Sequence, residues 1–127
     1  MILFINASPK LKMSNSEYFI NLLNIKNKKI NYIYKDKYAD TEKNIYKASK
    51  IIFVYPTYID IIPSKLINFI ENYKGNFNNK EIYLIANCGF LEPKNNDLGI
   101  KFMKNYIKEK QGSFKGYLSI GSGEVIG

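Results

Sequence analysis

Three short runs of the sequence are almost entirely apolar and rich in β-branched residues. They are residues 2–5 (ILFI), 50–55 (KIIFVY) and 81–86 (EIYLIA). A strand without polar alternation is typically buried on both of its faces, as happens in a parallel sheet covered by helices. Segments with helical periodicity separate these runs, and we expect helices over residues 15–23, 40–49, 62–73 and 97–110.

Two further strands are expected, over residues 29–34 and 114–120, which makes five. The first of them, KINYIY, alternates apolar and polar residues and is therefore expected at an edge of the sheet. Alternation of strand and helix from end to end predicts a three-layer α/β fold with a doubly wound parallel sheet. Five strands favour the order 2-1-3-4-5 over a barrel, which needs eight.

In such a sheet the ligand lies beyond the carboxyl ends of the strands, where the strand order switches between the first and third strands. Three loops reach that edge, residues 6–16, 56–62 and 87–96. The first is rich in hydroxyl, amide and ammonium groups. Ser14 followed by Glu17 forms a capping box, so a helix begins near Asn15 and directs its N–H groups and positive dipole end at this loop.

These features predict an anion site, with phosphate as the natural guest. An ordinary polar loop without a ligand explains the same residues equally well. The loop is neither a Walker loop nor a G-x-G-x-x-G turn, because both glycine patterns are absent.

Length and composition limit the class of protein. A chain of 127 residues with 46% hydrophobic residues can form one domain with one core. Met1 leads into a strand without a basic segment, so we expect no signal peptide, and no apolar run approaches the ~20 residues of a membrane helix. A single cysteine, Cys88, excludes an internal disulfide and a cysteine-ligated iron–sulfur cluster, and it suits a reducing cytoplasm. The absence of histidine removes the commonest metal ligand and general base, and we expect no metal site.

The net charge of +8 raises nucleic acid as a partner. However, every basic residue is lysine, so the bidentate guanidinium contacts that recognise guanine are missing. The lysines are also scattered along the chain. We therefore expect no nucleic-acid partner and no membrane partner.

Residues 8–16 (SPKLKMSNS) resemble the SPRKNGNS-type phosphate loop of the flavodoxin-like NAD(P)H-dependent FMN reductases. Lys10 keeps the charge where that family often has arginine. Met13 stands where glycine is usual and tolerates a positive φ poorly. The resemblance implies a flavodoxin-like fold and an FMN phosphate held by Ser8, Lys10, Ser14, Asn15 and Ser16.

Residues 55–66 (YPTYIDIIPSKL) resemble the P-x-Y-x-x-x-x-P-x-x-L signature with which the same family holds the isoalloxazine ring. Pro56 is expected to end its strand, after which backbone N–H groups can meet the polar edge of the ring. Tyr58 offers a flat face for stacking. The resemblance implies ring binding by Pro56, Thr57, Tyr58 and Ile59. A structural turn in which Tyr58 covers the core is the alternative.

Residues 87–92 (NCGFLE) resemble the NCGF-type loop that flanks the other side of the flavin in that family. The resemblance adds Asn87, Gly89 and Phe90 to the ring site, and Gly89 would let the backbone approach the ring closely. Cys88 has no histidine to serve as its base, so we assign it a packing role. No catalytic side chain is expected, because the flavin itself carries the hydride chemistry.

The sequence after the last expected strand, GSGEVIG, is a near miss to a dinucleotide-binding motif, and we set it aside because its spacing is wrong and no helix follows. Members of the resembling family continue there into a fifth helix. We therefore expect one flavodoxin-like domain over residues 1–127, truncated before that helix. The sheet face left uncovered would favour a homodimer.

The resemblance thus implies an FMN-binding oxidoreductase that uses NAD(P)H to reduce a flavin, a quinone or a similar small-molecule acceptor. One alternative is a flavodoxin-type electron carrier, although flavodoxins are typically acidic and this chain carries +8. The other is a truncated interaction domain that binds no flavin. Colour after addition of FMN would distinguish the flavin-free domain from the other two candidates. Oxidation of NAD(P)H would distinguish the reductase from the electron carrier.

Overall fold

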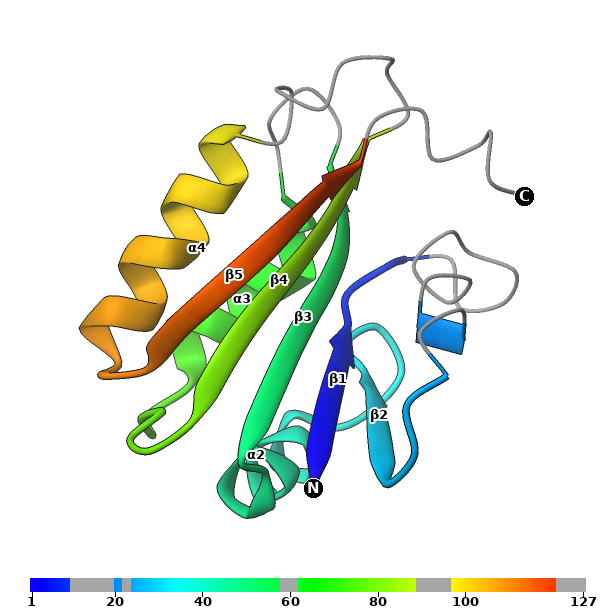
Figure 1. Ribbon diagram of the computed structural model, residues 1–127, viewed down its shortest axis with the longest axis vertical. Coiled ribbons are helices and arrows are strands. Elements are labelled where there is room, and N and C mark those ends of the chain that lie inside the picture. The colour runs from blue at the N-terminus through cyan, green and yellow to red at the C-terminus, as the bar shows by residue number, and fades with distance from the viewer. Residues whose placement is uncertain (10–19, 22–23, 58–61, 89–96, 121–127) are drawn as a thin grey trace.

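The computed structural model is built on one five-stranded sheet in the order β2-β1-β3-β4-β5, with every neighbouring pair parallel (Figure 1). The strands are β1 Ile2–Asn6, β2 Lys28–Tyr32, β3 Lys50–Thr57, β4 Glu81–Cys88 and β5 Ser113–Ile120. The helices are α2 Tyr38–Lys47, α3 Ser64–Asn72 and α4 Asp97–Glu109. The structure describes residues 1–9, 20–21, 24–57, 62–88 and 97–120. The predicted strand order is confirmed, as is the edge position of the second strand.

The larger core lies between the sheet and helices α2, α3 and α4, which all pack on one face. It is formed by fully or almost fully buried apolar side chains from both layers, among them Leu3, Ile45, Phe53, Leu66, Phe69, Leu84 and Met103. A row of rings, Phe69, Tyr73 and Phe77, stacks through this core at centroid distances of 5.8 and 5.4 Å. This face is therefore well filled along its length.

The opposite face carries a smaller cluster. Phe4, Ile52, Val54 and Ile85 project from the strands, and Ile20 packs on them from residues 20–21, which are helical. Helices thus lie on both sides of the sheet, as the pattern of apolar strands predicts. The remaining residues of the helix expected over 15–23 lie outside the described ranges.

Most elements begin or end one or two residues away from the sequence-based expectation, and β2 shows a local reason. Strand β2 ends at Tyr32, two residues early, because the backbone N–H groups of Lys35 and Asp36 both turn back to the Tyr32 carbonyl, at 3.1 and 2.7 Å. Helix α2 begins at Tyr38, two residues earlier than expected.

The prediction that Pro56 ends its strand is wrong. It lies within β3, where it is paired with Asn87 of β4, and the strand continues one residue beyond it. On the other side of β3, pairing with β1 stops at Asn6 and Val54, and the last bond runs from the Ala7 N–H to the Val54 carbonyl at 2.8 Å. Backbone groups alternate sides along a strand, so the N–H that proline lacks would point to this side, where β1 has ended. The next bond of this ladder would run from the N–H of residue 56 to the Ala7 carbonyl, so the pairing with β1 ends where proline offers no donor.

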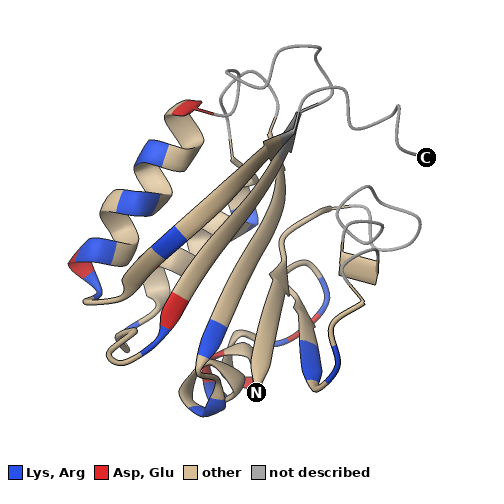
Figure 2. Cartoon of the chain, in the orientation of Figure 1, with Lys and Arg blue, Asp and Glu red and all other residues tan. Residues whose placement is uncertain are grey.

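The described lysines are spread over α4, around α2 and along β2 rather than gathered in one block (Figure 2). Among the described helices, none is long and apolar enough to span a membrane.

Candidate functional site

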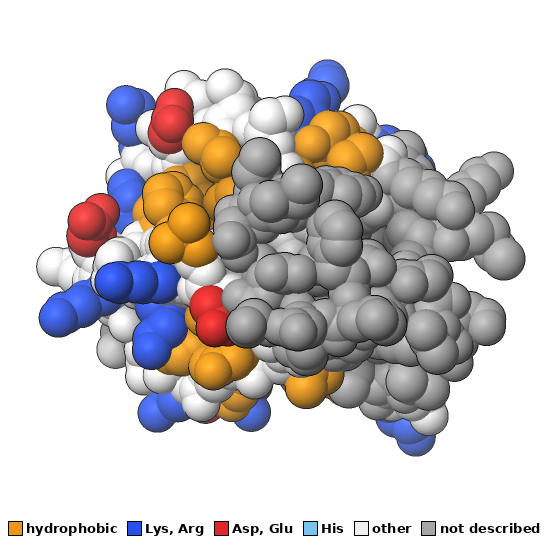
Figure 3. Space-filling view, turned by 90° about the horizontal axis from the view of Figure 1, so that it is seen from above, with side chains coloured by type: hydrophobic (Ala, Val, Ile, Leu, Met, Phe, Trp, Pro, Cys, Tyr) orange, Lys and Arg blue, Asp and Glu red, His pale blue; other side chains and the backbone are white. Residues whose placement is uncertain are grey.

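The carboxyl ends of β1, β3 and β4 lie side by side at one edge of the sheet. From β1 the chain leads to β2 on one side, whereas β3 leads to β4 on the other, so the strand order switches between β1 and β3. Figure 3 looks onto this edge, where described hydrophobic side chains and lysines border the residues drawn in grey. Open α/β sheets bind their ligands at such a switch point.

The loop after β1 starts with a turn held by Asn6. The Ser8 N–H donates to Oδ1 of Asn6 at 3.0 Å, and the Ile33 N–H donates to the Asn6 carbonyl at 3.0 Å. The Ala7 N–H donates to Val54 of the neighbouring strand. Asn6 and Ala7 together tie the start of the loop to Ile33 on one side and to Val54 of β3 on the other.

Sequence analysis did not include Asn6 in the site. An asparagine at the end of a strand, followed two residues later by serine, is a common side-chain-to-backbone turn, and that signal was present in the sequence. The side chains of Asn6 and Ser8 are 1% and 5% exposed, and both residues have further interaction partners. The first predicted phosphate ligand, Ser8, thus lies buried at the switch point.

The end of β3 meets the end of β4 next to this turn. Pro56 is in register with Asn87, and Thr57 with Cys88. Thr57 is fully buried and has an interaction partner. The structure therefore brings together the starts of all three predicted loops: Ser8, Pro56, Thr57 and Asn87. The other predicted ligands lie outside the described residues: Lys10, Ser14, Asn15, Ser16, Tyr58, Ile59, Gly89 and Phe90.

The first turn of α4 lies against Thr57 and Ile62. A Cβ at Gly99 of α4 would lie 2.9 Å from Cγ2 of Ile62, which lies two residues before α3, and 3.8 Å from Cγ2 of Thr57. Glycine at this position lets α4 pack this close. Sequence analysis did not single out Gly99.

The charges at this edge are mixed, because Asp97 lies in the first turn of α4. Helix N-termini carry partial positive charge from their free N–H groups. Helix α3 has no acidic residue in its first turn and no side-chain cap, so nothing in its own sequence offsets that charge. Lys65 adds a cation there, with its Nζ 5.5 Å from the centre of the Tyr34 ring.

Acid–base groups are scarce at this edge. Tyr55, one residue before Pro56, has a buried hydroxyl without a hydrogen-bond partner among the described residues, and burial raises its pKa far above 10.0. It stays neutral at physiological pH. Within the described ranges, no three His, Cys, Asp or Glu side chains are grouped so as to hold a metal ion. The described part of this edge thus presents a fixed turn at Ser8, the N-terminus of α3 and the Lys65 ammonium.

No protein-family model matches the sequence, and no curated protein matches it. Solved structures do match. One is the Trp repressor binding protein from Bacillus subtilis, with 20% identity and a TM-score of 0.81 over 95% of this chain and 83% of that chain. Another is an NADPH-quinone reductase from P. pentosaceus, with 15% identity and a TM-score of 0.76 over 96% of this chain and 85% of that one.

A third match is general stress protein 14 from Treponema denticola in complex with FMN, with 14% identity and a TM-score of 0.73 over 98% of this chain and 88% of that one. Flavodoxins and an NADH:FMN oxidoreductase are also among the matching structures. At such identities the likeness is one of fold. Together with the strand order, it shows that this chain has the flavodoxin-like fold.

Proposed function

We propose that this chain is an FMN-binding oxidoreductase that uses NAD(P)H to reduce a flavin, a quinone or a similar small molecule. The observation that carries the proposal is the meeting of three loop starts at the strand switch point, with Ser8, Thr57 and Asn87 on adjacent strands. The loops that begin there carry the three sequence patterns that resemble FMN-binding loops.

The chemistry of the donor set fits a phosphate monoester at the first loop. Ser8 supplies a hydroxyl at a position fixed by the Asn6 turn. In our proposal Lys10 supplies the positive charge, and Ser14, Asn15 and Ser16 supply further donors at the start of the following helix. Charge-assisted hydrogen bonds of this kind are stronger than those between neutral groups.

The other two loops would hold the ring of the cofactor. Pro56 and Thr57 begin one wall, which Tyr58 and Ile59 continue, and Asn87, Gly89 and Phe90 form the other. When bound, FMN would supply the hydride chemistry. The protein would anchor the phosphate, orient the ring and exclude water.

The described activities and ligands of three matching structures support this proposal. One is an NADPH-quinone reductase, one is an FMN complex and one is an NADH:FMN oxidoreductase. The proposal includes a cytoplasmic location, where NAD(P)H is available.

An electron carrier without NAD(P)H activity is the second candidate, because flavodoxins also match. Carriers of this fold commonly dock through an acidic surface, whereas this chain has a net charge of +8. We therefore rank the reductase first.

A spectroscopic titration tests the proposal. We expect purified protein to bind FMN, with a shift of its visible bands, and the complex to oxidise NADH or NADPH when menadione is supplied. FMN binding without NAD(P)H oxidation would favour the carrier. Absence of FMN binding at tens of micromolar would overturn both and leave a flavin-free interaction domain.

A further inference from the structure

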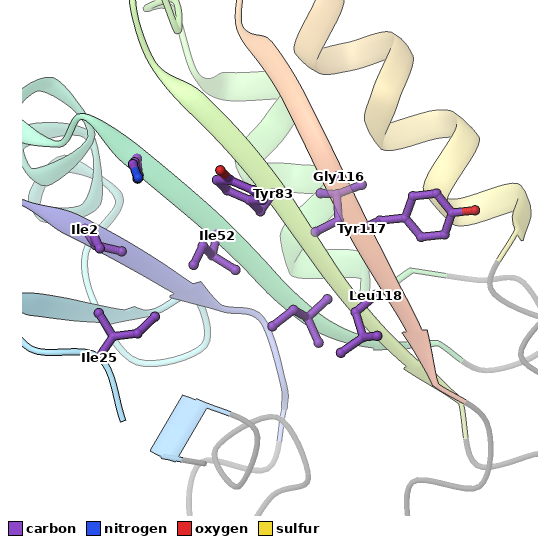
Figure 4. A pocket seen from close by; sticks show the side chains of 10 residues that line it. Ile2, Ile25, Ile52, Tyr83, Gly116, Tyr117 and Leu118 are labelled. Atoms are coloured by element: carbon purple, nitrogen blue, oxygen red, sulfur yellow. The ribbon is translucent and has the colours of Figure 1, made fainter. Parts of the chain in front are cut away.

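Two hollows among the described residues differ in the chemistry of their lining. One of about 470 Å³ lies on the sheet face opposite α2, α3 and α4, over Ile52, Tyr83 and Gly116, and its lining is mostly apolar (Figure 4). The other, of about 510 Å³, lies between β2 and α2 at the edge of the sheet. Charged side chains line this second hollow, which we call the edge groove: Lys29, Lys35, Lys43, Lys47, Asp36 and Asp40.

A network of hydrogen bonds forms the floor of the edge groove. Asn31 is only 4% exposed, and its Oδ1 accepts a hydrogen bond from Nδ2 of Asn44 at 2.7 Å. Nδ2 of Asn31 in turn donates to Oδ2 of Asp36 at 3.1 Å, and the Tyr32 N–H donates to the same oxygen at 2.8 Å. The network joins β2 to α2 and uses the Asp36 carboxylate within the chain.

Three lysines surround one end of this network, from both β2 and α2 (Figure 2). Lys29 is two residues before Asn31, on the same face of β2. Lys43 and Lys47 lie one turn apart on α2 and flank Asn44. Helix α2 runs antiparallel to the strands, so Lys29 and Lys47 are displaced from the network in the same direction. This end of the groove lies at the amino ends of the strands, away from the switch point.

The end of α2 does not account for this positive charge. The last carbonyl groups of a helix attract cations. At α2, however, the Lys80 ammonium already binds them, because its Nζ donates to the carbonyls of Tyr46 and Ala48 at 3.1 and 2.6 Å. The three lysines of the groove form no ion pair with a carboxylate in the described part of the chain.

The carboxylates of this region are engaged elsewhere. Asp36 is held by the floor network, and Asp40 lies in the first turn of α2, where it meets the positive end of the helix dipole. Glu42 lies toward Tyr73, whose pKa is raised by burial and then by this carboxylate. The amino end of the groove therefore keeps an excess of positive charge.

We propose that the edge groove binds a phosphorylated small molecule, with its phosphate among Lys29, Lys43 and Lys47. A phosphate monoester carries about −1.5 to −2 charges at neutral pH, and lysine binds phosphate as a point charge. Oδ1 of Asn44 accepts no hydrogen bond from a described residue, so it can accept one from a hydroxyl group of the ligand. The volume of the groove suits a small molecule. The proposal does not rest on flavin binding.

A compact ligand fits the groove better than an added peptide strand. The Ile33 N–H donates to the Asn6 carbonyl of β1, and backbone groups alternate sides, so those of Tyr32 point to the outer edge. The Tyr32 N–H is bonded to Asp36, and its carbonyl accepts from the turn that follows. A peptide strand would find both groups occupied.

An NMR titration of the isotope-labelled full chain without flavin tests the proposal. We expect the side-chain amide signals of Asn31 and Asn44 to shift with glucose 6-phosphate and with pyrophosphate, but not with glucose. The double variant Lys43→Gln/Lys47→Gln should raise the dissociation constant of both phosphates at least tenfold, because it removes two of the three ammonium groups. Binding at the loop after β1 would not respond to these substitutions. Lys29→Gln should weaken binding at least threefold from the β2 side.

The double variant Lys104→Gln/Lys108→Gln is the matched control. Both of these lysines are exposed and lie one turn apart on α4, and Lys108 is in the last turn of its helix, as Lys47 is in α2. The control removes the same charge and should bind both phosphates like the wild type. Glutamine favours helix almost as well as lysine, and circular dichroism checks that each variant is folded.

Absence of shifts at Asn31 and Asn44 up to about 10 mM of either phosphate would overturn the proposal. Equal losses of affinity in the α2 and α4 double variants would also overturn it, because net charge alone would then explain binding. An unchanged affinity in Lys29→Gln would exclude a site shared by strand and helix. Tighter binding of a polyglutamate peptide than of glucose 6-phosphate would assign the groove to an acidic peptide instead.

Discussion

The Ser8 backbone N–H donates to Oδ1 of Asn6, 3.0 Å away, in a buried turn at the carboxyl end of β1. This bond fixes the first residue of the proposed phosphate loop. Asn6→Ala would remove the acceptor, and leaving a buried donor unsatisfied costs about 1–3 kcal/mol. We expect a lower free energy of unfolding in urea and an FMN affinity about tenfold weaker in a fluorescence titration.

The chain offers a matched control. The Asn78 N–H donates to Oδ1 of Asn76, also at 3.0 Å, in an exposed turn between α3 and β4. Asn76→Ala should leave FMN affinity unchanged. An equal loss of affinity in the two variants would contradict the role of Asn6.

FMN should bind at least tenfold more tightly than riboflavin, because the first loop is proposed to bind phosphate. Each charge-assisted hydrogen bond lost with the phosphate is worth about 1.5–3 kcal/mol. The preference should shrink below about pH 6, where a phosphate monoester gains a proton. Calorimetric titration with both ligands measures it, and equal affinities would refute the phosphate assignment.

Tyr58→Ala should weaken FMN binding more than Cys88→Ser. We assign Tyr58 to ring stacking, which contributes about 0.5–1.5 kcal/mol beyond its buried area, and we assign Cys88 only to packing. Fluorescence titration and steady-state turnover measure both variants. Loss of turnover in Cys88→Ser with flavin still bound would give the thiol a chemical role.

Gly99→Ala should destabilise the chain. The added Cβ would lie 2.9 Å from Cγ2 of Ile62, a stiff β-branched side chain. Overpacking costs about 1–3 kcal/mol, which exceeds the gain of up to ~1 kcal/mol for alanine over glycine in a helix. Gly116→Ala, with nothing within 4 Å, should be neutral or stabilising. Urea unfolding at low protein concentration gives the free energy of unfolding of both variants. Equal values for Gly99→Ala and Gly116→Ala would disprove the close contact between Gly99 and Ile62.

Tyr55→Phe should raise the free energy of unfolding by about 1 kcal/mol, because it removes a buried hydroxyl that has no partner in the described part of the chain. Tyr73→Phe should lower it by a similar amount, since the Tyr73 hydroxyl donates to the Asn76 carbonyl at 3.0 Å. A loss of stability in Tyr55→Phe would show that its hydroxyl does have a partner.

The Tyr55 substitution also has a consequence at high pH. Burial raises the pKa of Tyr55 above the value of 10.0 that it has when exposed. Its contribution to stability is therefore complete below pH ~10 and falls as the pH rises beyond that, because only the unfolded chain then releases the proton. Tyr55→Phe should lose less stability between pH 9 and pH 11 than the wild type, as measured by urea unfolding.

Much of the fold could be predicted from the sequence, because its signals are local. Apolar runs such as 50–55 mark strands buried on both faces, and the alternation in 29–34 marks an edge strand. Counting five strands separated by helical segments then leaves few topologies. The sequence patterns also indicated the three loops of the candidate site, since the strand order determines which loops share an edge.

Other features depend on neighbours distant in the sequence. Pro56 stays within β3 because β1 has ended on the side where its N–H is missing, and only the register of two strands decides that. The close approach of Gly99 to Ile62 depends on how α4 meets the segment before α3, and the hollow over Gly116 depends on which elements cover each face. The sequence by itself determined the elements and their order, because periodicity and propensity act within a segment. Only the tertiary structure decided which backbone groups need partners and which surfaces stay open, because packing acts between segments.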